Sequence, residues 1–174
     1  MDIKPVLENF QANPFWRAFY ADPIGTAFET EITFLLQHYH EIKITRQSEK
    51  KLACDFSMYL DLAYAHVTLS QDKLRIFQSV YSEVEKELEQ PSLLIYLECD
   101  PEIELQRIRN RGRDVENSIT IEYLQAINEQ LEKILKERSC SHELLIIDSG
   151  LRDFAYDEGV KHVILEKINS KFTL

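Results

Sequence analysis

Hydrophobic residues follow two different patterns along this chain. Between residues 27 and 39 the apolar positions recur every three or four residues, at Ala27, Phe28, Ile32, Leu35, Leu36 and Tyr39, a spacing that places them on one face of a helix. Residues 93–97 and 144–147 are instead short continuous apolar runs, which are typical of strands buried on both faces of a parallel sheet. Strands that alternate with helices indicate an α/β domain with a mainly parallel sheet.

Cap residues and prolines set the expected boundaries of the other elements. We expect strands over residues 3–8, 52–56 and 144–148, the second of them buried, and a closing helix over 160–168. Helices are expected to begin at Asn13-Pro14, Asp22-Pro23, Ser70, Asp100-Pro101 and Thr120, where a polar residue precedes an apolar stripe. The chain contains no glycine-, serine- or proline-rich linker and no repeat, so residues 1–174 are expected to form one domain.

Composition narrows the class of protein. The chain has 174 residues, 44% of them hydrophobic, which suits one globular domain. Its 20 basic and 30 acidic residues give a formal net charge of -10, and such a surface repels nucleic acid. The apolar runs fall short of the ~20 residues that cross a bilayer, and no basic signal region follows Met1. We therefore expect a soluble cytoplasmic protein that binds neither nucleic acid nor a membrane.

Cysteine and histidine give no sign of a disulfide framework or a metal site. Cys54, Cys99 and Cys140 are odd in number and widely spaced, so we expect reduced thiols. His38 and His40 lie two residues apart, which on a helix points them to different faces, and no third ligand follows at zinc spacing. We interpret both histidines as surface residues and expect no metal held by the protein.

The strongest chemical signal is a group of four arginines, Arg107, Arg109, Arg111 and Arg113, in a chain that is acidic overall. Arg107 and Arg111 share one helix face, and Gly112 permits a turn that brings Arg113 back. Several guanidinium groups can then converge on one polyanion as a phosphate clamp. The structural alternative is a solvated basic helix end that complements the negative end of the helix dipole.

Carboxylates form a second candidate group, because Glu8, Asp55 and Asp148 each follow an apolar run. Open parallel sheets bind ligands outside the carboxyl ends of their strands. The three side chains are therefore candidates for a base or a metal-associated role, although each singly also fits a cap or turn residue. Eight aromatic residues could line a pocket and stack on a flat ligand, although most of them are equally well explained as core residues. They are Phe15, Trp16, Phe19, Tyr20, Phe28, Phe34, Tyr59 and Tyr64.

Three blocks of residues occur in an informative order. The first comprises Glu8, Asn13-Pro14-Phe15, Phe19-Tyr20, Asp22-Pro23, Phe28 and Glu31; the second Asp55-Phe56-Ser57, Asp61 and Tyr64; the third runs from Pro91 through Arg107, Arg111-Gly112-Arg113 and Glu116 to Tyr123-Leu124. Over nearly the whole chain they resemble the deoxynucleoside kinase family, in particular its bacterial deoxyadenosine and deoxyguanosine kinase-like branch. The resemblance implies the P-loop kinase fold, a parallel sheet flanked by helices. It also implies phosphate transfer from ATP with Mg2+ to the 5'-hydroxyl of a purine deoxynucleoside, and a homodimer as a candidate assembly.

The resemblance implies a role for each matching residue. Glu8 would activate the sugar 5'-hydroxyl, and Tyr20 and Glu116 would hold the 3'-hydroxyl. Glu31 and Asp61 would read the base. The remaining matches would surround the base or bind the donor phosphates: Phe28 and Tyr64 as an aromatic wall, and Arg107, Arg111 and Arg113 on the phosphates, with Arg107 also among the catalytic residues.

Two departures from the family pattern affect these roles. Many family members have an arginine where this chain has Phe56, so one contact near the 5'-hydroxyl is absent. The phosphate loop G-x-x-x-x-G-K-[ST], whose backbone amides and lysine cradle phosphates, does not occur among the four glycines Gly25, Gly112, Gly150 and Gly159. The resemblance begins at the family's second strand, so the first strand, the loop and its helix have no counterpart.

Three hypotheses follow. The chain is an N-terminally shortened nucleoside kinase that retains Glu8, Glu31, Asp61 and Glu116; or it is a non-catalytic kinase-like protein that binds a nucleoside or a partner; or it is a structural subunit with the fold alone. A strand and glycine-rich loop encoded in frame before Met1 would select the first. Because the family's first strand lies in the middle of the sheet, we expect its neighbours here either to pair directly or to expose unpaired backbone.

Overall fold

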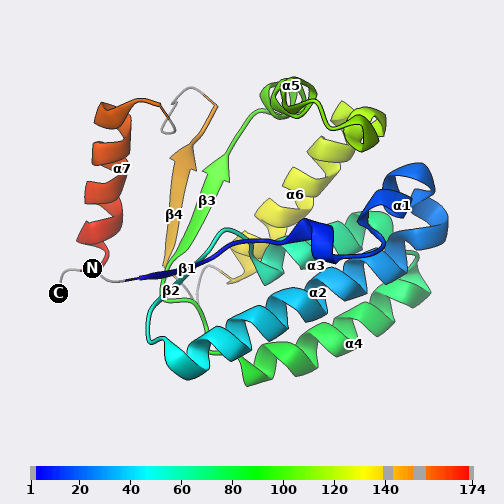
Figure 1. Cartoon of the computed structure of the whole chain (residues 1–174), viewed down its shortest axis with the longest axis horizontal. Helices are drawn as coiled ribbons and strands as arrows, with labels where there is room; N and C mark the ends of the chain where they lie inside the picture. Colours follow the sequence, from blue (N-terminus) through cyan, green and yellow to red (C-terminus); the bar gives the residue numbers. More distant parts are fainter. Residues whose placement is uncertain (1–2, 139–142, 151–155, 173–174) are drawn as a thin grey trace.

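The computed structural model describes residues 3–138, 143–150 and 156–172, and within them the chain forms helices interspersed with four short strands (Figure 1). In chain order the elements are β1 (Lys4–Val6), η1 (Phe10–Ala12), α1 (Trp16–Ala21), α2 (Pro23–Ser48), β2 (Leu52–Cys54), α3 (Met58–Thr68), α4 (Gln71–Glu87), β3 (Leu94–Glu98), α5 (Pro101–Arg111), η2 (Asp114–Ser118), α6 (Ile121–Arg138), β4 (Leu144–Asp148) and α7 (Glu158–Ser170). The predicted alternation of strands and helices is confirmed.

Local sequence explains where several helices begin and end. Asp22 caps α2, and its carboxylate accepts a 3.0 Å hydrogen bond from the backbone N–H of Gly25. Asp100 caps α5 in the same way through the N–H of Glu102, at 2.8 Å. The helix ends at Gly112, whose φ of 68° lies in the left-handed region that glycine adopts without strain. The helix starts predicted at Asp22 and Asp100, and the turn predicted at Gly112, are confirmed.

The first helix begins later than the sequence predicts, because Asn13 has a different task. Its side chain is buried, with Oδ1 accepting a 2.9 Å hydrogen bond from the N–H of Phe15 and Nδ2 donating to the carbonyl of Thr30 at 3.0 Å. The N-cap of α1 is Phe15, and the helix starts at Trp16. Asn13 therefore ties the segment after β1 to α2 instead of starting a helix.

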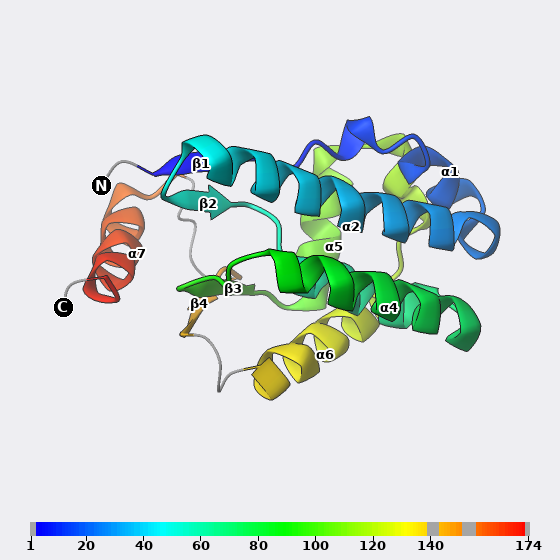
Figure 2. The ribbon, with the colours of Figure 1, turned by 90° about the horizontal axis from the view of Figure 1, so that it is seen from below.

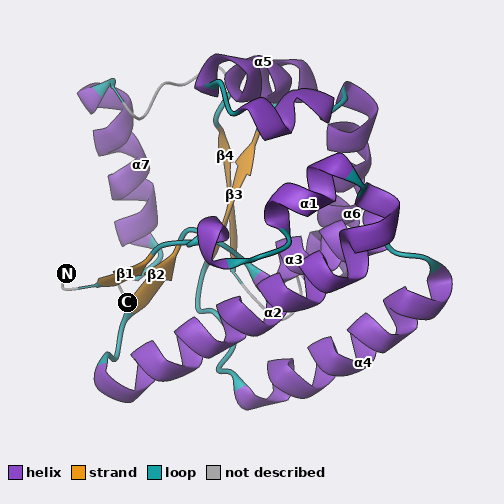
Figure 3. Ribbon diagram, turned by 45° about the vertical axis from the view of Figure 1, so that its right-hand side comes forward, coloured by secondary structure: helices purple, strands orange, loops and turns teal. Residues whose placement is uncertain are grey.

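Helices α2, α3, α4 and α6 enclose the main hydrophobic core, and α1 packs against α2 (Figure 3). Leu35 of α2, Ala63 of α3 and Phe77 of α4 have no exposed surface. Burying a side chain such as Leu35 or Phe77 contributes roughly 1.5–3 kcal/mol relative to leaving it exposed. This helical body supports the side chains that face the carboxyl end of β1.

The strands form two separate parallel pairs instead of one sheet (Figure 2). In the first pair Lys4–Val6 lies opposite Leu52–Cys54, and in the second Leu94–Glu98 lies opposite Leu144–Asp148. Among the described residues no hydrogen-bonded ladder joins one pair to the other. Of the two arrangements expected from the sequence, the structure has unpaired strand edges.

The strands are also less buried than predicted. Ile95 and Leu97 on one face of β3 are 43% and 47% exposed, whereas Leu94 and Tyr96 on the other face pack against the core. In β2, Ala53 and Cys54 are exposed. The prediction of strands buried on both faces was therefore wrong, because in the described parts of the chain helices cover only one face of β3.

The C-terminal helix α7 stands apart from the helical body in Figure 1. It begins at Glu158, two residues before the predicted 160, where the carboxylate of Asp157 accepts hydrogen bonds from the N–H groups of Gly159 and Val160. None of its residues is buried. It begins earlier than predicted because Asp157 provides a cap that the apolar pattern alone did not mark.

Two remaining predictions concern thiols and membranes. Cys54 and Cys99 are free thiols, as predicted, and Cys140 lies outside the described residues. In the described ranges no helix combines the length and the apolar character that crossing a bilayer requires.

Candidate active site

Glu8 and Asp55 lie together at the carboxyl end of the β1–β2 pair. Glu8 follows β1 by two residues, and its backbone N–H donates a 2.6 Å hydrogen bond to Oδ1 of Asp55, the residue after β2. The carboxylate of Asp55 thus fixes the backbone of Glu8, while the Glu8 side chain keeps 40% of its surface exposed. Of the three carboxylates expected at one sheet edge, Glu8 and Asp55 lie together, whereas Asp148 ends β4 in the other strand pair.

His38 lies between Glu8 and Asp61, which corrects its prediction as a surface residue. Its Nδ1 is 3.0 and 2.9 Å from the two carboxylate oxygens of Asp61, and its Nε2 is 3.3 Å from Oε1 of Glu8. The imidazole stacks on Phe56 with 4.0 Å between ring centroids. Burial alone would lower the pKa of His38, but interactions with Asp61 and Glu8 outweigh this effect and raise the pKa to about 9. At neutral pH the ring is therefore an imidazolium.

The sequence contains a signal that would have placed His38 in the interior. It follows Leu35 by three residues and Glu31 by seven, so it continues the buried stripe of α2. The argument that two histidines spaced by two point to different faces holds, since His40 is exposed. That argument did not determine which of the two histidines points into the core.

Asp61 and Glu31 add two buried carboxyl groups to this site. Burial, followed by the charge of Asp61, raises the pKa of Glu31 to about 8, although Thr68 donates a 3.2 Å hydrogen bond to it. Burial also raises the pKa of Asp61, and the hydrogen bond from His38 counteracts part of that effect. At neutral pH Glu31 is therefore protonated, and a neutral carboxyl group can donate one hydrogen bond as well as accept others.

Tyr20 and Tyr64 extend the cluster. Burial and the charge of Glu116 raise the pKa of Tyr20 to about 12, against the effect of nearby arginines. Burial raises the pKa of Tyr64, and the charges of Glu31 and Glu8 act in the same direction. Both phenols therefore keep their protons and can act as hydrogen-bond donors.

Two of the predicted phosphate-binding arginines converge on a carboxylate of the protein itself. Glu116 is 4% exposed and accepts hydrogen bonds at Oε2 from Nε and Nη2 of Arg111, at 3.2 and 2.7 Å, and at Oε1 from Nη1 of Arg113, at 3.2 Å. The guanidinium of Arg113 also lies 4.2 Å from the ring centroid of Phe10. Arg109 donates to the carbonyls of Glu116 and Ile119 and thereby holds η2 in place. The convergence predicted for Arg107, Arg111 and Arg113 thus holds for the last two only, and the anion that they bind here is Glu116.

Arg107 makes its contacts at a different place. Its Nη2 donates a 2.6 Å hydrogen bond to the carbonyl of Ser149, just after β4, and its Nη1 lies 3.6 Å from Sγ of Cys99, just after β3. Asp148, the last residue of β4, accepts a 2.9 Å hydrogen bond from the N–H of Gly150. Arg107 and Asp148 thus belong to the carboxyl end of the β3–β4 pair.

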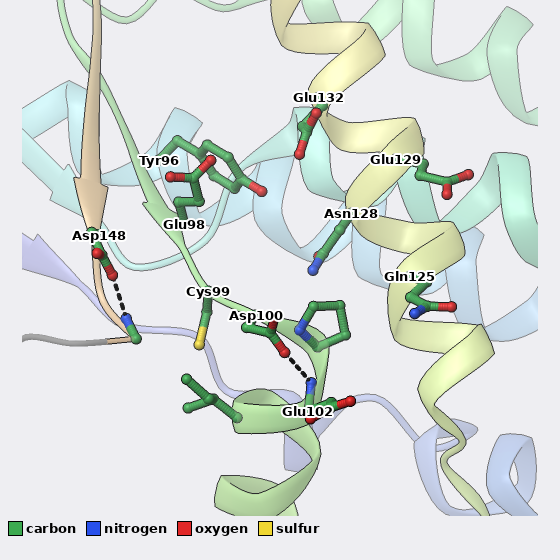
Figure 4. Close-up of a pocket in the computed structure, with 13 residues that line it drawn as sticks. Tyr96, Glu98, Cys99, Asp100, Glu102, Gln125, Asn128, Glu129, Glu132 and Asp148 are labelled. Atoms are coloured by element: carbon green, nitrogen blue, oxygen red, sulfur yellow. Dashed lines mark hydrogen bonds between the residues drawn. The ribbon is translucent and has the colours of Figure 1, made fainter.

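Two cavities lie near these groups. The larger, about 760 Å³, opens at the carboxyl end of β3–β4, where carboxylates of Glu98, Asp148, Glu129 and Glu132 surround it (Figure 4). The smaller, about 290 Å³, is lined by residues that include Tyr20, Thr68, Ile119 and Tyr123. Its volume is close to the lower end, roughly 300 Å³, of pockets that hold small ligands. Thr68 lines this second cavity and donates a hydrogen bond to Glu31, so the cavity adjoins the buried carboxyl groups.

The residues predicted for the site divide into two sets. Contacts and electrostatic interactions connect eight of them, together with His38, in one group: Glu8, Tyr20, Glu31, Asp61, Tyr64, Arg111, Arg113 and Glu116. Arg107 makes its hydrogen bonds at the carboxyl end of the β3–β4 pair instead, and the ring centroid of Phe28 lies 5.7 Å from Nζ of Lys73 on α4. In the described residues no three His, Cys, Asp or Glu side chains are grouped so that they could hold a metal ion.

Comparison with known proteins gives consistent matches. Residues 3–173 match the family model described as deoxynucleoside kinase. The deoxyguanosine kinase of Bacillus subtilis (strain 168) is 27% identical over 158 residues, which cover 87% of this chain and 76% of that protein. The deoxyadenosine/deoxycytidine kinase of the same organism is 29% identical over 170 residues, or 88% and 78% of the two chains. The deoxyguanosine kinase of Dictyostelium discoideum is 28% identical, and the chain covers 55% of its length.

Solved structures agree in fold. Deoxyadenosine kinase from M. mycoides with bound dCTP superimposes with a TM-score of 0.81 at 22% identity, over 97% of this chain and 86% of that one. The same enzyme with the products dCMP and a flexible dCDP gives a TM-score of 0.82 at 22% identity, with the same coverage. At this level of identity the likeness concerns the arrangement of helices and parallel strands.

Proposed function

Because the chain belongs to the deoxynucleoside kinase family and has its P-loop kinase fold, we propose that the clustered carboxyl groups bind a deoxynucleoside and that Glu8 accepts the proton of its 5'-hydroxyl. The observation that carries this proposal is the convergence of Glu8 and Asp61 on one buried histidine, with Glu31 beside Asp61. The backbone of Glu8 is fixed by Asp55, and its side chain remains accessible, as a base that must reach a hydroxyl requires.

The other groups suit a sugar and a base. Tyr20, a protonated phenol, and Glu116, an ionic acceptor bound by two arginines, provide a donor and an acceptor for the 3'-hydroxyl. Glu31 and Asp61 offer a neutral carboxyl group and an anionic one to the polar edge of the base. Tyr64, together with Phe28 one turn before Glu31 on α2, is proposed for the aromatic wall around the base.

A purine is the proposed base. Relatives in four organisms are named deoxyguanosine kinases. Adenine, guanine and cytosine all place donors beside acceptors on the pairing edge, and a protonated Glu31 next to Asp61 can complement each of them, so the names of the relatives carry the preference for a purine. Because one relative is named deoxyadenosine/deoxycytidine kinase, deoxycytidine is the competing substrate to measure.

ATP is the proposed phosphate donor, with Arg111, Arg113 and Arg107 on its phosphates. Phosphoryl transfer depends almost entirely on positioning and on electrostatic stabilisation of the phosphates. The 174-residue sequence contains no G-x-x-x-x-G-K-[ST] loop. We therefore propose that this chain by itself binds a deoxynucleoside without transferring phosphate.

A second candidate is a kinase-like protein whose nucleoside site serves binding alone, or docking of a partner. The division of the described strands into two pairs favours it. Both candidates share the same nucleoside site. They differ in whether Glu8 has a chemical task in addition to binding.

The test is a titration of the chain with the four deoxynucleosides by isothermal calorimetry and thermal shift. A ligand at 100 times its Kd stabilises the folded protein by about 2.7 kcal/mol. Asp61→Asn should lower the affinity for deoxyguanosine or deoxyadenosine about tenfold or more, because a hydrogen bond to a charged group contributes roughly 1.5–3 kcal/mol. Glu83→Gln, at an exposed position of α4, is the control and should have no effect. Failure of every deoxynucleoside to bind at millimolar concentration contradicts the proposal.

A further inference from the structure

We propose that His38 is a positioning residue that, as an imidazolium, holds the carboxylates of Glu8 and Asp61 in the geometry in which they bind and act on the nucleoside. The inference rests on the proposed function, since it assigns a task within the same site. It concerns a residue whose sequence context suggested no role.

The contact with Asp61 fixes one side of the imidazole. Nδ1 lies within 3.0 Å of both oxygens of Asp61, and an ionised carboxylate only accepts hydrogen bonds, so Nδ1 carries a hydrogen. His38 is on α2 and Asp61 on α3, two helices of the packed body. This anchor therefore does not depend on a loop.

Stacking fixes the plane of the ring. Phe56 lies parallel to the imidazole within 10°, at 4.0 Å between centroids, and Phe34 lies 5.8 Å away with 29° between the planes. With Asp61 at one ring nitrogen and aromatic groups against the ring, the direction of Nε2 is determined before any ligand binds. Nε2 points toward Glu8.

The contact with Glu8 is the adjustable one. Nε2 is 3.3 Å from Oε1 of Glu8, but the two atoms are not aligned for a hydrogen bond, and among the described residues Nε2 is a buried nitrogen without a hydrogen-bond partner. The His38 side chain is 5% exposed, whereas that of Glu8 is 40% exposed. A small rotation of Glu8 completes the bond, since a buried donor without a partner costs roughly 1–3 kcal/mol. The bond selects the side-chain rotamer that aims Glu8 at the site.

The positive charge of His38 is a second reason to assign it the positioning role. The ionisable groups that interact with His38 are Glu8, which follows β1, and Asp61 on α3; Glu31 on its own helix interacts in turn with Asp61. Without a cation the carboxylates of Glu8 and Asp61 would repel one another. His38 supplies that cation, and its pKa of about 9 keeps it charged at neutral pH.

The decisive experiment is an NMR titration of the imidazole nitrogens of His38 in the ligand-free chain. The signal, assigned by its loss in His38→Gln, should titrate near pH 9, and Glu8→Gln and Asp61→Asn should each lower the midpoint. Removing the Glu8 charge lowers the midpoint only if its carboxylate lies beside Nε2 in solution, so this shift tests the contact, and the pH dependence of nucleoside binding tests the positioning role. An unchanged midpoint in Glu8→Gln therefore overturns the proposal.

Nucleoside binding supplies the second readout. Affinity of the wild-type chain for a purine deoxynucleoside should fall as the pH rises through about 9, where His38 loses its proton, and should lose this dependence in His38→Gln. At pH 7 His38→Gln and His38→Phe should bind about tenfold more weakly or worse, while His40→Gln, an exposed change on the same helix, should match the wild type. Equal pH profiles for the wild type and His38→Gln contradict the positioning role. If the wild-type chain binds no deoxynucleoside, the proposed function fails, and the ligand-free titration still decides whether His38 couples to Glu8.

Discussion

Arg111 donates two hydrogen bonds to a single oxygen of Glu116, one from Nε at 3.2 Å and one from Nη2 at 2.7 Å. Glu116 therefore interacts with two parts of the site. It is a buried anion for the arginines after α5, and its charge acts on the phenol of Tyr20. A change at this one side chain should affect both the nucleoside end of the site and the arginines proposed for phosphates.

Replacing the charge in Glu116→Gln should move the two kinds of ligand in opposite directions. Affinity for a purine deoxynucleoside should fall about tenfold or more, because an ionic acceptor for the 3'-hydroxyl is lost. Affinity for tripolyphosphate should rise, because Arg111 and Arg113 lose their internal anion. Calorimetry with each ligand checks both effects. Parallel changes for the two ligands would disprove the link between Glu116 and the arginines.

Glu31 should make the stability of the chain depend on pH. Its pKa is about 8 in the folded protein against an ordinary value of 4.5, so the folded state binds more protons than the unfolded state between these values. Stability should therefore fall as the pH rises from about 4.5 to about 8. Glu31→Gln, which cannot ionise, should flatten this fall and melt roughly 2–8 °C above the wild type at pH 8.5, for a gain of about 1–2 kcal/mol. Thermal melts at several pH values measure it, with Glu83→Gln as the control; a wild-type slope retained in Glu31→Gln would refute the assignment.

Catalysis should require groups that this sequence does not contain. Removing one preorganised donor from a reaction centre costs on the order of a hundredfold to a thousandfold in rate, so the 174-residue chain should show no ATP-dependent phosphorylation of deoxynucleosides. An N-terminal extension with a strand, a G-x-x-x-x-G-K-[ST] loop and a helix should confer activity, and Glu8→Gln should abolish it. A coupled assay for ADP release tests both. Robust activity of the chain alone would mean that a phosphate site exists among residues to which no such role is assigned. An extended chain that binds ATP and a deoxynucleoside but shows no activity would favour the binding-only candidate.

Core packing should dominate stability at Phe77. Its side chain on α4 has no exposed surface, and Phe77→Ala should cost about 3–5 kcal/mol through lost burial and the cavity left behind. The neighbouring Ile76 is 55% exposed, so Ile76→Ala is the matched control and should cost much less. Urea denaturation gives both values. Similar losses at the two positions would contradict the packing of α4.

The sequence was sufficient where local chemistry decides the outcome. Asp22-Pro23, Asp100-Pro101 and Gly112 determine helix ends through hydrogen bonds within a few residues, and the structure has them as predicted. The carboxylates after β1 and β2 were also placed correctly, because parallel strands bring their carboxyl ends to one edge.

Prediction from sequence failed where a residue's partners are distant in the chain. His38 continues the buried stripe of α2, but spacing along one helix does not tell that Asp61, 23 residues later, and Glu8 meet its ring there. The hydrogen bonds of Arg111 and Arg113 to Glu116, which the sequence did not indicate, depend on the fold of η2, while the sugar contact of Glu116 stays a prediction. The exposure of Ile95 and Leu97 likewise depends on what covers β3, which an apolar run cannot report.

The division of the strands into two pairs has a consequence for how the protein behaves at high concentration. Each pair presents a strand edge whose N–H and C=O groups lack a ladder partner among the described residues. Beside the edge of β3, the side chains of Ile95 and Leu97 are apolar and partly exposed. Such an edge is a template on which another polypeptide can add a strand, and copies of the same chain are the most abundant candidates in a purified sample. Self-association through these edges should therefore lower the solubility of the chain. A strand that paired with these edges would prevent such association.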